Sequence, residues 1–190
     1  MMRIVRVTGW RRTVCAVAFV LGWIGQARAQ GQWDLWYSVA DAASHNDMQQ
    51  VVALLKAGNR DADAIESSTG RTALDFAATF DNIPMAKALL ENNAHINAPD
   101  RFGNTALYYA VERDAIDFIR FLLANKASVD AANRQGVTPL MTAASEGKAA
   151  AVRLLLASGA DPRKQDFTGR DTFGWAAGRP AVQQALAAKP

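Results

Sequence analysis

Few residues of this chain have side chains that could perform catalytic or metal-binding chemistry. The 190 residues include one cysteine and two histidines, His45 and His95. Neither histidine has another histidine or a cysteine at the short spacing that zinc sites use. We predict that His45 lies in a turn between two helices and His95 in a loop, both exposed and too far apart to share a metal or relay a proton. The sequence therefore predicts no enzyme, no metal site and no cofactor.

One cluster of acidic residues could bind a cation. Asp61, Asp63 and Glu66 lie close together in the sequence, and carboxylate oxygens are ligands that calcium prefers. Their spacing does not match that of a known calcium loop. A solvated acidic loop is therefore the favoured interpretation, and a cation site is the alternative.

The first 29 residues have the pattern of a cleavable secretory signal peptide. A basic segment without acids is followed by an apolar run of about a dozen residues, too short for a membrane-spanning helix. Ala27 and Ala29 supply the small-x-small pattern of a cleavage site, so cleavage is expected between Ala29 and Gln30. The alternatives are an uncleaved membrane anchor and, because Arg11 and Arg12 are adjacent, export by the twin-arginine route.

Loss of this segment changes the charge of the chain. It removes five of the 21 basic residues and none of the 18 acidic ones, which lowers the net charge from +3 to about −2. A nucleic-acid partner is therefore not expected. Cys15 leaves with the same segment, so the mature chain has no thiol for a disulfide. We expect residues 30–190 to form one domain in the periplasm or outside the cell, without membrane insertion.

A short block of residues recurs through the mature chain at a fixed interval. Its glycines, Gly70, Gly103, Gly136 and Gly169, are 33 residues apart, and a period of this size is typical of repeat arrays. The block from Gly136 reads Gly-Val-Thr-Pro-Leu-Met-Thr-Ala, which resembles the Gly-x-Thr-Pro-Leu-His-x-Ala pattern of the ankyrin repeat. The resemblance covers about 33–190 and implies an all-α solenoid of about five helix-turn-helix units with β-hairpin-like loops. We place the units at about 33–65, 66–98, 99–131, 132–164 and 165–190, with atypical capping units at both ends.

The helices within each unit are predicted from apolar periodicity and cap residues. The first unit is expected to have an inner helix over 35–43 and an outer helix over 48–57, with Gly58 beyond it, and the last unit a closing helix over 181–189. The threonine of the block is expected to cap each regular inner helix; these residues are Thr72, Thr105 and Thr138. The left-handed positions after the outer helices are expected at Asn93, Lys126 and Gly159, of which Lys126 is the strained one. The usual histidine of the block is replaced by Asp75, Tyr108, Met141 and Gly174.

An ankyrin stack binds proteins through the concave surface of its hairpin tips and inner helices, so the resemblance implies a protein partner. We expect exposed aromatic and arginine side chains there, the types that dominate the energy of protein interfaces. At or beside the tips these residues are Arg101, Phe102, Arg134, Gln135, Phe167 and Arg170, and on the inner helices they are Phe76, Tyr109 and Trp175. The alternative is that Phe76 and Trp175 pack beneath the hairpins. The arginines predict a partner with an acidic patch.

The chain resembles small exported bacterial ankyrin-repeat proteins. This resemblance implies a scaffold that protects a periplasmic or secreted partner, or else an effector or antidote that binds a host or competitor protein. A self-associating structural protein is a further alternative, although a monomer is favoured. The sequence does not separate these cases.

Overall fold

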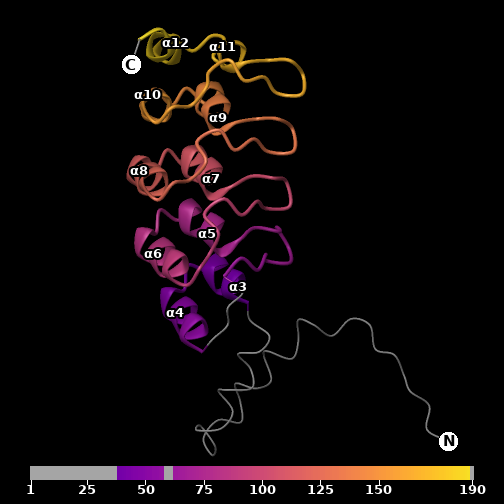
Figure 1. Cartoon of the computed structure of the whole chain (residues 1–190), viewed down its shortest axis with the longest axis vertical. Coiled ribbons are helices and arrows are strands. Elements are labelled where there is room, and N and C mark those ends of the chain that lie inside the picture. The colour runs from indigo at the N-terminus through magenta and orange to yellow at the C-terminus, as the bar shows by residue number, and fades with distance from the viewer. Residues whose placement is uncertain (1–37, 58–61, 189–190) are drawn as a thin grey trace, which may run out of the picture. The chain divides into compact units, whose positions relative to one another are not determined.

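The computed structural model describes residues 38–57 and 62–188. Over these ranges, helices follow one another as antiparallel pairs along the chain (Figure 1). The five pairs are α3 (Val39–Ser44) with α4 (Met48–Lys56), α5 (Ala73–Thr79) with α6 (Ile83–Glu91), α7 (Ala106–Glu112) with α8 (Ile116–Ala124), α9 (Pro139–Ser145) with α10 (Ala149–Ala157), and α11 (Thr172–Trp175) with α12 (Pro180–Ala187).

The first helix of each pair lies in an inner layer and the second in an outer layer (Figure 1). Within the inner layer α5 packs against α3 and α7, and α9 packs against α7 and α11. The loops between pairs extend from the inner layer as hairpin-like turns on one side of the stack (Figure 1). The described residues form no extended strand, and two of these turns are closed by isolated antiparallel bridges, Ile65 with Thr72 and Gln165 with Asp171. This arrangement confirms the predicted all-α solenoid with hairpin-like loops.

The core runs along the whole stack because the same positions of each unit are apolar. Leu74, Leu107 and Leu140 are 2 % exposed or less, and they fix the inner helices against the outer ones. Small residues at Ala77, Ala110 and Ala143 are fully buried, which lets neighbouring inner helices approach closely. The outer helices contribute Leu89, Leu122 and Leu155, which are also fully buried. None of the helices that the model describes is long and apolar enough to cross a membrane.

The predicted threonine caps are confirmed in two of the three regular units. Thr72 accepts a hydrogen bond from the N–H of Asp75, and Thr138 accepts one from the N–H of Met141. The prediction is wrong for Thr105, which makes no side-chain cap and whose buried Oγ1 has no partner among the described residues. Asp75 Oδ2 in turn accepts from the backbone N–H of Thr72 at 2.8 Å, whereas Tyr108 at the equivalent position of the third unit accepts no such bond.

The left-handed positions after the outer helices are confirmed. Asn93, Lys126 and Gly159 have φ values of 67°, 68° and 91°. A lysine in this region carries a steric penalty that glycine does not have, so the strain predicted at Lys126 is present.

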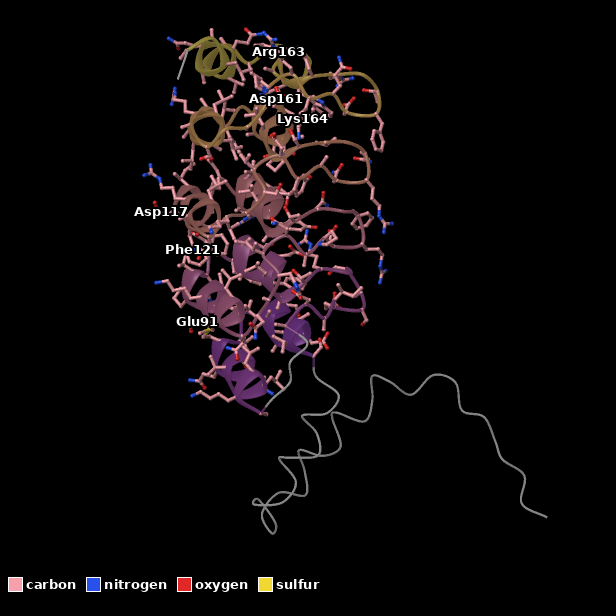
Figure 2. The ribbon with its side chains drawn as sticks, in the orientation of Figure 1. Glu91, Asp117, Phe121, Asp161, Arg163 and Lys164 are labelled. Atoms are coloured by element: carbon pink, nitrogen blue, oxygen red, sulfur yellow. The ribbon has the colours of Figure 1, made fainter. Side chains whose placement is uncertain are left out.

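A second set of hydrogen bonds joins successive units beside the outer helices. The N–H of His95 donates to Asp63 at 2.7 Å, that of Ser128 to Asn97 at 2.8 Å, and that of Asp161 to Asp130 at 3.2 Å. Figure 2 shows Asp161 with Arg163 and Lys164 in the loop that leaves α10. Lys164 adds an ion pair to Asp130 at 3.3 Å.

The terminal units depart most from the sequence predictions. The first inner helix begins at Val39 rather than at residue 35, because Ser38 forms a capping box with Asp41. In the last unit α11 has only four residues, and Asp171 replaces threonine as its cap by accepting from the N–H of Gly174. The closing helix begins at Pro180 and ends at Ala187.

Several predictions fall outside the described residues. They are the signal peptide over 1–29 with Cys15, the cleavage site between Ala29 and Gln30, the residues of the first unit before Ser38, and Gly58, Asp61 and Lys189.

Candidate protein-binding surface

Each described hairpin is held in shape by one acceptor side chain at its start, which is buried in three of the four hairpins and half-buried in the other. In the third unit Asp100 Oδ1 accepts hydrogen bonds from the backbone N–H groups of Phe102 at 2.8 Å and of Asn104 at 2.7 Å. Asn133 and Asp166 accept the equivalent bonds in the next two hairpins. These acceptors were not among the predicted site residues, although the 33-residue spacing of Asp100, Asn133 and Asp166 is visible in the sequence.

In the second unit the acceptor is Glu66, which lies one position earlier in the repeat than Asp100 does. The side chain of glutamate is one methylene longer than that of aspartate, and this length lets it reach the turn. Its carboxylate accepts from the N–H groups of Ser68 and Thr69, each at 2.7 Å. Burial alone would raise the pKa of Glu66, but these hydrogen bonds outweigh it and lower the pKa to about 2. The expected solvated acidic loop is therefore wrong at Glu66, which is 9 % exposed.

The hairpins are joined edge to edge by backbone hydrogen bonds. The N–H of Arg101 donates to Gly70 O at 3.1 Å, and the N–H of Arg134 donates to Phe102 O at 3.0 Å. The N–H of Phe167 continues the series to Gln135 O at 3.0 Å. Side chains at the tips are thereby held in a row by the backbone.

The tip residues predicted to bind a partner are exposed. Phe102 is 62 % exposed and Phe167 is 81 % exposed. The polar residues of the prediction are exposed as well, namely Arg101, Arg134, Gln135 and Arg170. Exposure makes them accessible to a partner, and their role in binding stays a prediction.

The expectation that Phe76 and Tyr109 are exposed is wrong. They are 7 % and 3 % exposed and belong to the buried core. The hydroxyl of Tyr109 donates to the buried carboxylate of Asp100 at 2.5 Å. Burial and this hydrogen bond together raise the pKa of Tyr109 to about 12. Tyr109 therefore supports the hairpin of its own unit, and the burial of Phe76 agrees with the packing alternative rather than with an exposed contact residue.

Trp175 is half-buried and repeats the arrangement of Tyr109 two units further on. Its Nε1–H donates to Asp166 at 3.0 Å, and the guanidinium of Arg170 lies 4.8 Å from its ring centroid. The same acid accepts from Thr168, and this bond with the others lowers the pKa of Asp166. Wherever the hairpin acceptor is an aspartate, an aromatic residue with a hydrogen-bond donor lies below it.

Arginine side chains cover Tyr109 and Trp175, the two aromatic residues that donate to the hairpin aspartates, from the solvent side. The Arg71 guanidinium carbon lies 4.0 Å from the ring centroid of Tyr109 and 6.0 Å from that of Phe76. A cation over an aromatic face is attracted by the ring quadrupole, so Arg71 is held in a defined place on the concave surface.

A pocket opens between α7 and the hairpins of the second and third units, which are the hairpins around Gly70 and Gly103. Its volume is about 480 Å³, and its walls include Arg71, Arg101, Phe102, Tyr108 and Glu112. This volume is in the range of ligand pockets in proteins, roughly 300–1,000 Å³. Aromatic rings and two guanidinium groups therefore meet at one hollow of the predicted binding surface.

The two histidines lie in different units and are exposed, as predicted. His45 contacts the backbone oxygen of Asp41 through Nδ1 at 2.9 Å. The ring of His95 forms a short contact with the carboxylate of Asp63, which raises the pKa of His95 through this hydrogen bond and the charge of the acid. The described part of the chain contains no group of three or more metal-ligating side chains.

Two family models match this chain. One, described as ankyrin repeats (3 copies), matches residues 94–166, and the other, described as ankyrin repeats (many copies), matches residues 54–110. Together they span residues 54–166, more than half of the 190 residues, and this region belongs to the ankyrin-repeat family. Ankyrin repeats are protein–protein interaction modules and are typically not enzymes. A comparison with curated proteins found no match.

Proposed function

We propose that this chain is an exported ankyrin-repeat protein that binds another protein through its hairpin edge and concave surface. The observation that carries the proposal is the exposure of two phenylalanines in the hydrogen-bonded row of hairpins. Phe102 and Phe167 are 62 % and 81 % exposed. Large aromatic side chains held outward by a fixed backbone are suited to fill pockets of a partner.

The charges on the same edge support this assignment. Arg101 and Arg134 occupy equivalent positions of successive hairpins, and both are exposed. Neither forms an ion pair with an acid within the described residues. A partner with an acidic patch would neutralise them and associate faster at low salt.

Export is the second part of the proposal. It is supported by the basic segment, the short apolar run and the Ala-Arg-Ala sequence at residues 27–29. In the periplasm or outside the cell, the repeat domain acts as a scaffold that protects its partner. The mass of the protein recovered from its host tests export: a chain that starts at Gln30 supports it, and an intact chain that starts at Met1 contradicts it.

Binding is tested by affinity capture from the compartment in which the protein is found. The parent chain is compared with a Phe102→Ala/Phe167→Ala double variant and with a control double variant, Arg120→Ala/Arg153→Ala. The control residues are exposed on the outer helices α8 and α10. We expect one protein that is captured by the parent and by the control and lost with the phenylalanine variant.

Three results would contradict the proposal. Capture that is unaffected by loss of both phenylalanines would show that the hairpin edge is not the binding site. If neither the parent nor any variant captures a protein, the chain has no protein-binding function in that compartment. A mass that rises with protein concentration, without other proteins, would instead show self-association.

A further inference from the structure

The pocket between the second and third hairpins contains charged groups that the fold does not use. The hydroxyls of Ser68 and Thr69 in its wall already donate to Glu66, and Asn104 bonds to Asp100 and Asn133. Within the described ranges, by contrast, the guanidinium of Arg71 has no hydrogen bond or ion pair.

The other polar groups of the pocket are also largely available. Arg101 makes a single long contact, from Nη2 to Ser67 O at 3.4 Å. Neither the hydroxyl of Tyr108 nor the carboxylate of Glu112 contacts another polar side chain of the described chain within hydrogen-bond distance. The pocket therefore presents two cations on the hairpin side and one anion on the α7 side.

Arg71 is prepared to bind an anion because the fold already fixes its position. Its guanidinium carbon lies 4.0 Å from the ring centroid of Tyr109. Tyr109 is itself fixed by its hydrogen bond to Asp100 at 2.5 Å. A side chain that is ordered before binding loses less conformational entropy on binding. Guanidinium groups match carboxylates in shape and hydrogen-bonding geometry.

The walls of the pocket also favour an apolar neighbour for that carboxylate. Phe102 is 62 % exposed at the rim, and Tyr108 is half-buried in the wall. Glu112 would repel a polyanion such as a nucleic acid, and the mature chain has a net charge of about −2. These features favour a single carboxylate beside an apolar side chain.

We propose that this pocket is a subsite for an acidic side chain in an extended segment of the partner protein. Arg71 and Arg101 bind its carboxylate, and an adjacent apolar residue of the segment packs on Phe102 and Tyr108. Glu112 excludes a second acid and accepts a basic or neutral residue. This inference rests on the proposed protein-binding function and adds the chemistry that one part of the surface recognises.

The test uses a displayed library of random dodecapeptides selected on the immobilised, purified full chain. The parent is compared with an Arg71→Gln/Arg101→Gln double variant and with an Arg120→Gln control on α8. Thermal unfolding of each variant checks that the stack is intact. We expect the parent and the control to enrich peptides with an Asp or Glu next to an apolar residue.

Individual selected peptides then give the size of the effect by fluorescence polarisation. The double variant should bind an enriched peptide roughly tenfold more weakly, because a charge-assisted pair is lost. An Arg71→Lys variant keeps the charge and should bind with intermediate affinity, since it loses the bidentate geometry. Added salt should weaken binding to the parent more than binding to the double variant.

The outcomes separate this inference from the proposed function. The subsite is contradicted if the enriched peptides lack acidic residues, or if the double variant still enriches acidic peptides. In either case the protein would still be a binding module. If the parent enriches no peptide, the subsite is overturned as well. The proposed function then depends on the capture experiment with Phe102 and Phe167, whose residues are separate from the arginines changed here.

Discussion

Asp75 is fully buried at the position where the ankyrin pattern has a histidine. Its Oδ2 accepts from the N–H of Thr72 at 2.8 Å, and its Oδ1 has no hydrogen-bond partner among the described residues. Burial raises the pKa of Asp75 from 3.8 to about 7, although the bonds from Thr72 and the charge of Arg71 oppose the shift. The folded chain therefore holds a proton on Asp75 that the unfolded chain releases at lower pH.

This raised pKa predicts a loss of stability as the pH increases. Below about pH 4 the proton is present in both states, and the full stabilisation is retained. Between about pH 4 and 7 the free energy of unfolding decreases as the pH rises, by on the order of a few kcal/mol in total. Urea unfolding at pH 4 and pH 8 measures this difference.

An Asp75→Asn variant is the matched control for that measurement. Asparagine keeps an acceptor for the N–H of Thr72 and cannot ionise, so we expect the variant to lose less stability than the parent between the two pH values. His95, whose pKa is also raised, contributes the same trend to both chains and cancels in the comparison. Equal losses in parent and variant would show that Asp75 does not titrate as inferred.

The hairpin glycines differ in what surrounds them, and this difference predicts different costs of substitution. Gly103 has φ 83°, and a Cβ there would lie 2.8 Å from the backbone nitrogen of Arg134. Gly169 has φ 80°, but a Cβ there would have no neighbour within 4 Å, because no described hairpin follows it. Both alanine variants carry the penalty of a left-handed backbone, about 1–2 kcal/mol. Only Gly103→Ala must also displace the next hairpin.

We therefore expect Gly103→Ala to destabilise the protein by roughly 1–3 kcal/mol more than Gly169→Ala does. Chemical denaturation of the two variants and the parent measures the difference. Equal costs would mean that the close contact between successive hairpins does not constrain the fold.

At the level of single helices, the C-terminal end of α7 is capped by a side chain from the neighbouring unit. Lys148 Nζ donates to Val111 O at 2.9 Å and also contacts Glu112 O and the carboxylate of Glu146. Val111 and Glu112 end α7, so a cation from the start of α10 satisfies the last carbonyls of a helix one unit away.

Removal of this ammonium group should weaken the junction between the third and fourth units. Lys148→Met keeps the apolar stem and leaves two carbonyls with fewer donors, so we expect a destabilisation of about 1–3 kcal/mol. Exposed Lys164, which pairs with Asp130 in a loop, is the control and should cost at most about 1 kcal/mol when changed to Met. Indistinguishable unfolding midpoints for the two variants would contradict the cross-unit cap.

The elements that repeat in the sequence were predictable, and the contacts between repeats were not. Leucines and alanines at the 33-residue period predicted the core, because identical units must bury identical faces. Thr105 is followed by the same Ala-Leu pair as Thr72 and yet makes no side-chain cap. The residue three positions later differs: Asp75 accepts from the N–H of Thr72, whereas Tyr108 accepts no bond from Thr105. The start of the first helix at Val39 depended likewise on the local cap at Ser38.

In the candidate site too, features set by the repeat register were predictable from the sequence, and contacts between residues far apart in the register were not. The exposure of Phe102 and Phe167 follows from their places at hairpin tips, which the repeat register gives. The burial of Tyr109 follows from its bond to Asp100, a residue nine positions earlier that the glycine-based register did not mark. A position-by-position alignment of the hairpins would have shown three of the four acceptors, Asp100, Asn133 and Asp166, but not Glu66, which lies one position earlier. The stacking of Arg71 on Tyr109 joins two units and has no signature within a single repeat.

At the scale of the whole stack, stability is the sum of the units and of the interfaces between them. Leu140 is fully buried in the middle of the stack, where α9 contacts helices on both sides. Leu140→Ala should therefore cost on the order of 2–5 kcal/mol, measured by thermal and chemical unfolding. An exposed alanine substitution such as Arg120→Ala should leave the midpoint nearly unchanged. Melting of Leu140→Ala at the temperature of the parent would show that the register of the repeats is wrong.

The two sides of the stack differ in what they offer to a partner. The hairpin side carries exposed aromatic and arginine residues, whereas the outer helices carry charged residues. Figure 2 shows two of these, Glu91 and Asp117, on the side opposite to the hairpins. We therefore expect a partner to contact one side only.

Site-specific photocrosslinking in the cells that produce the protein shows which side of the stack a partner contacts. A photoreactive residue is placed at Phe102 in one chain and at Asp117 in another, and covalent products are resolved by mass. The account predicts a discrete product with a second protein from position 102 and none from position 117. Products from position 117 alone, or from neither position, would contradict a binding surface on the hairpin side.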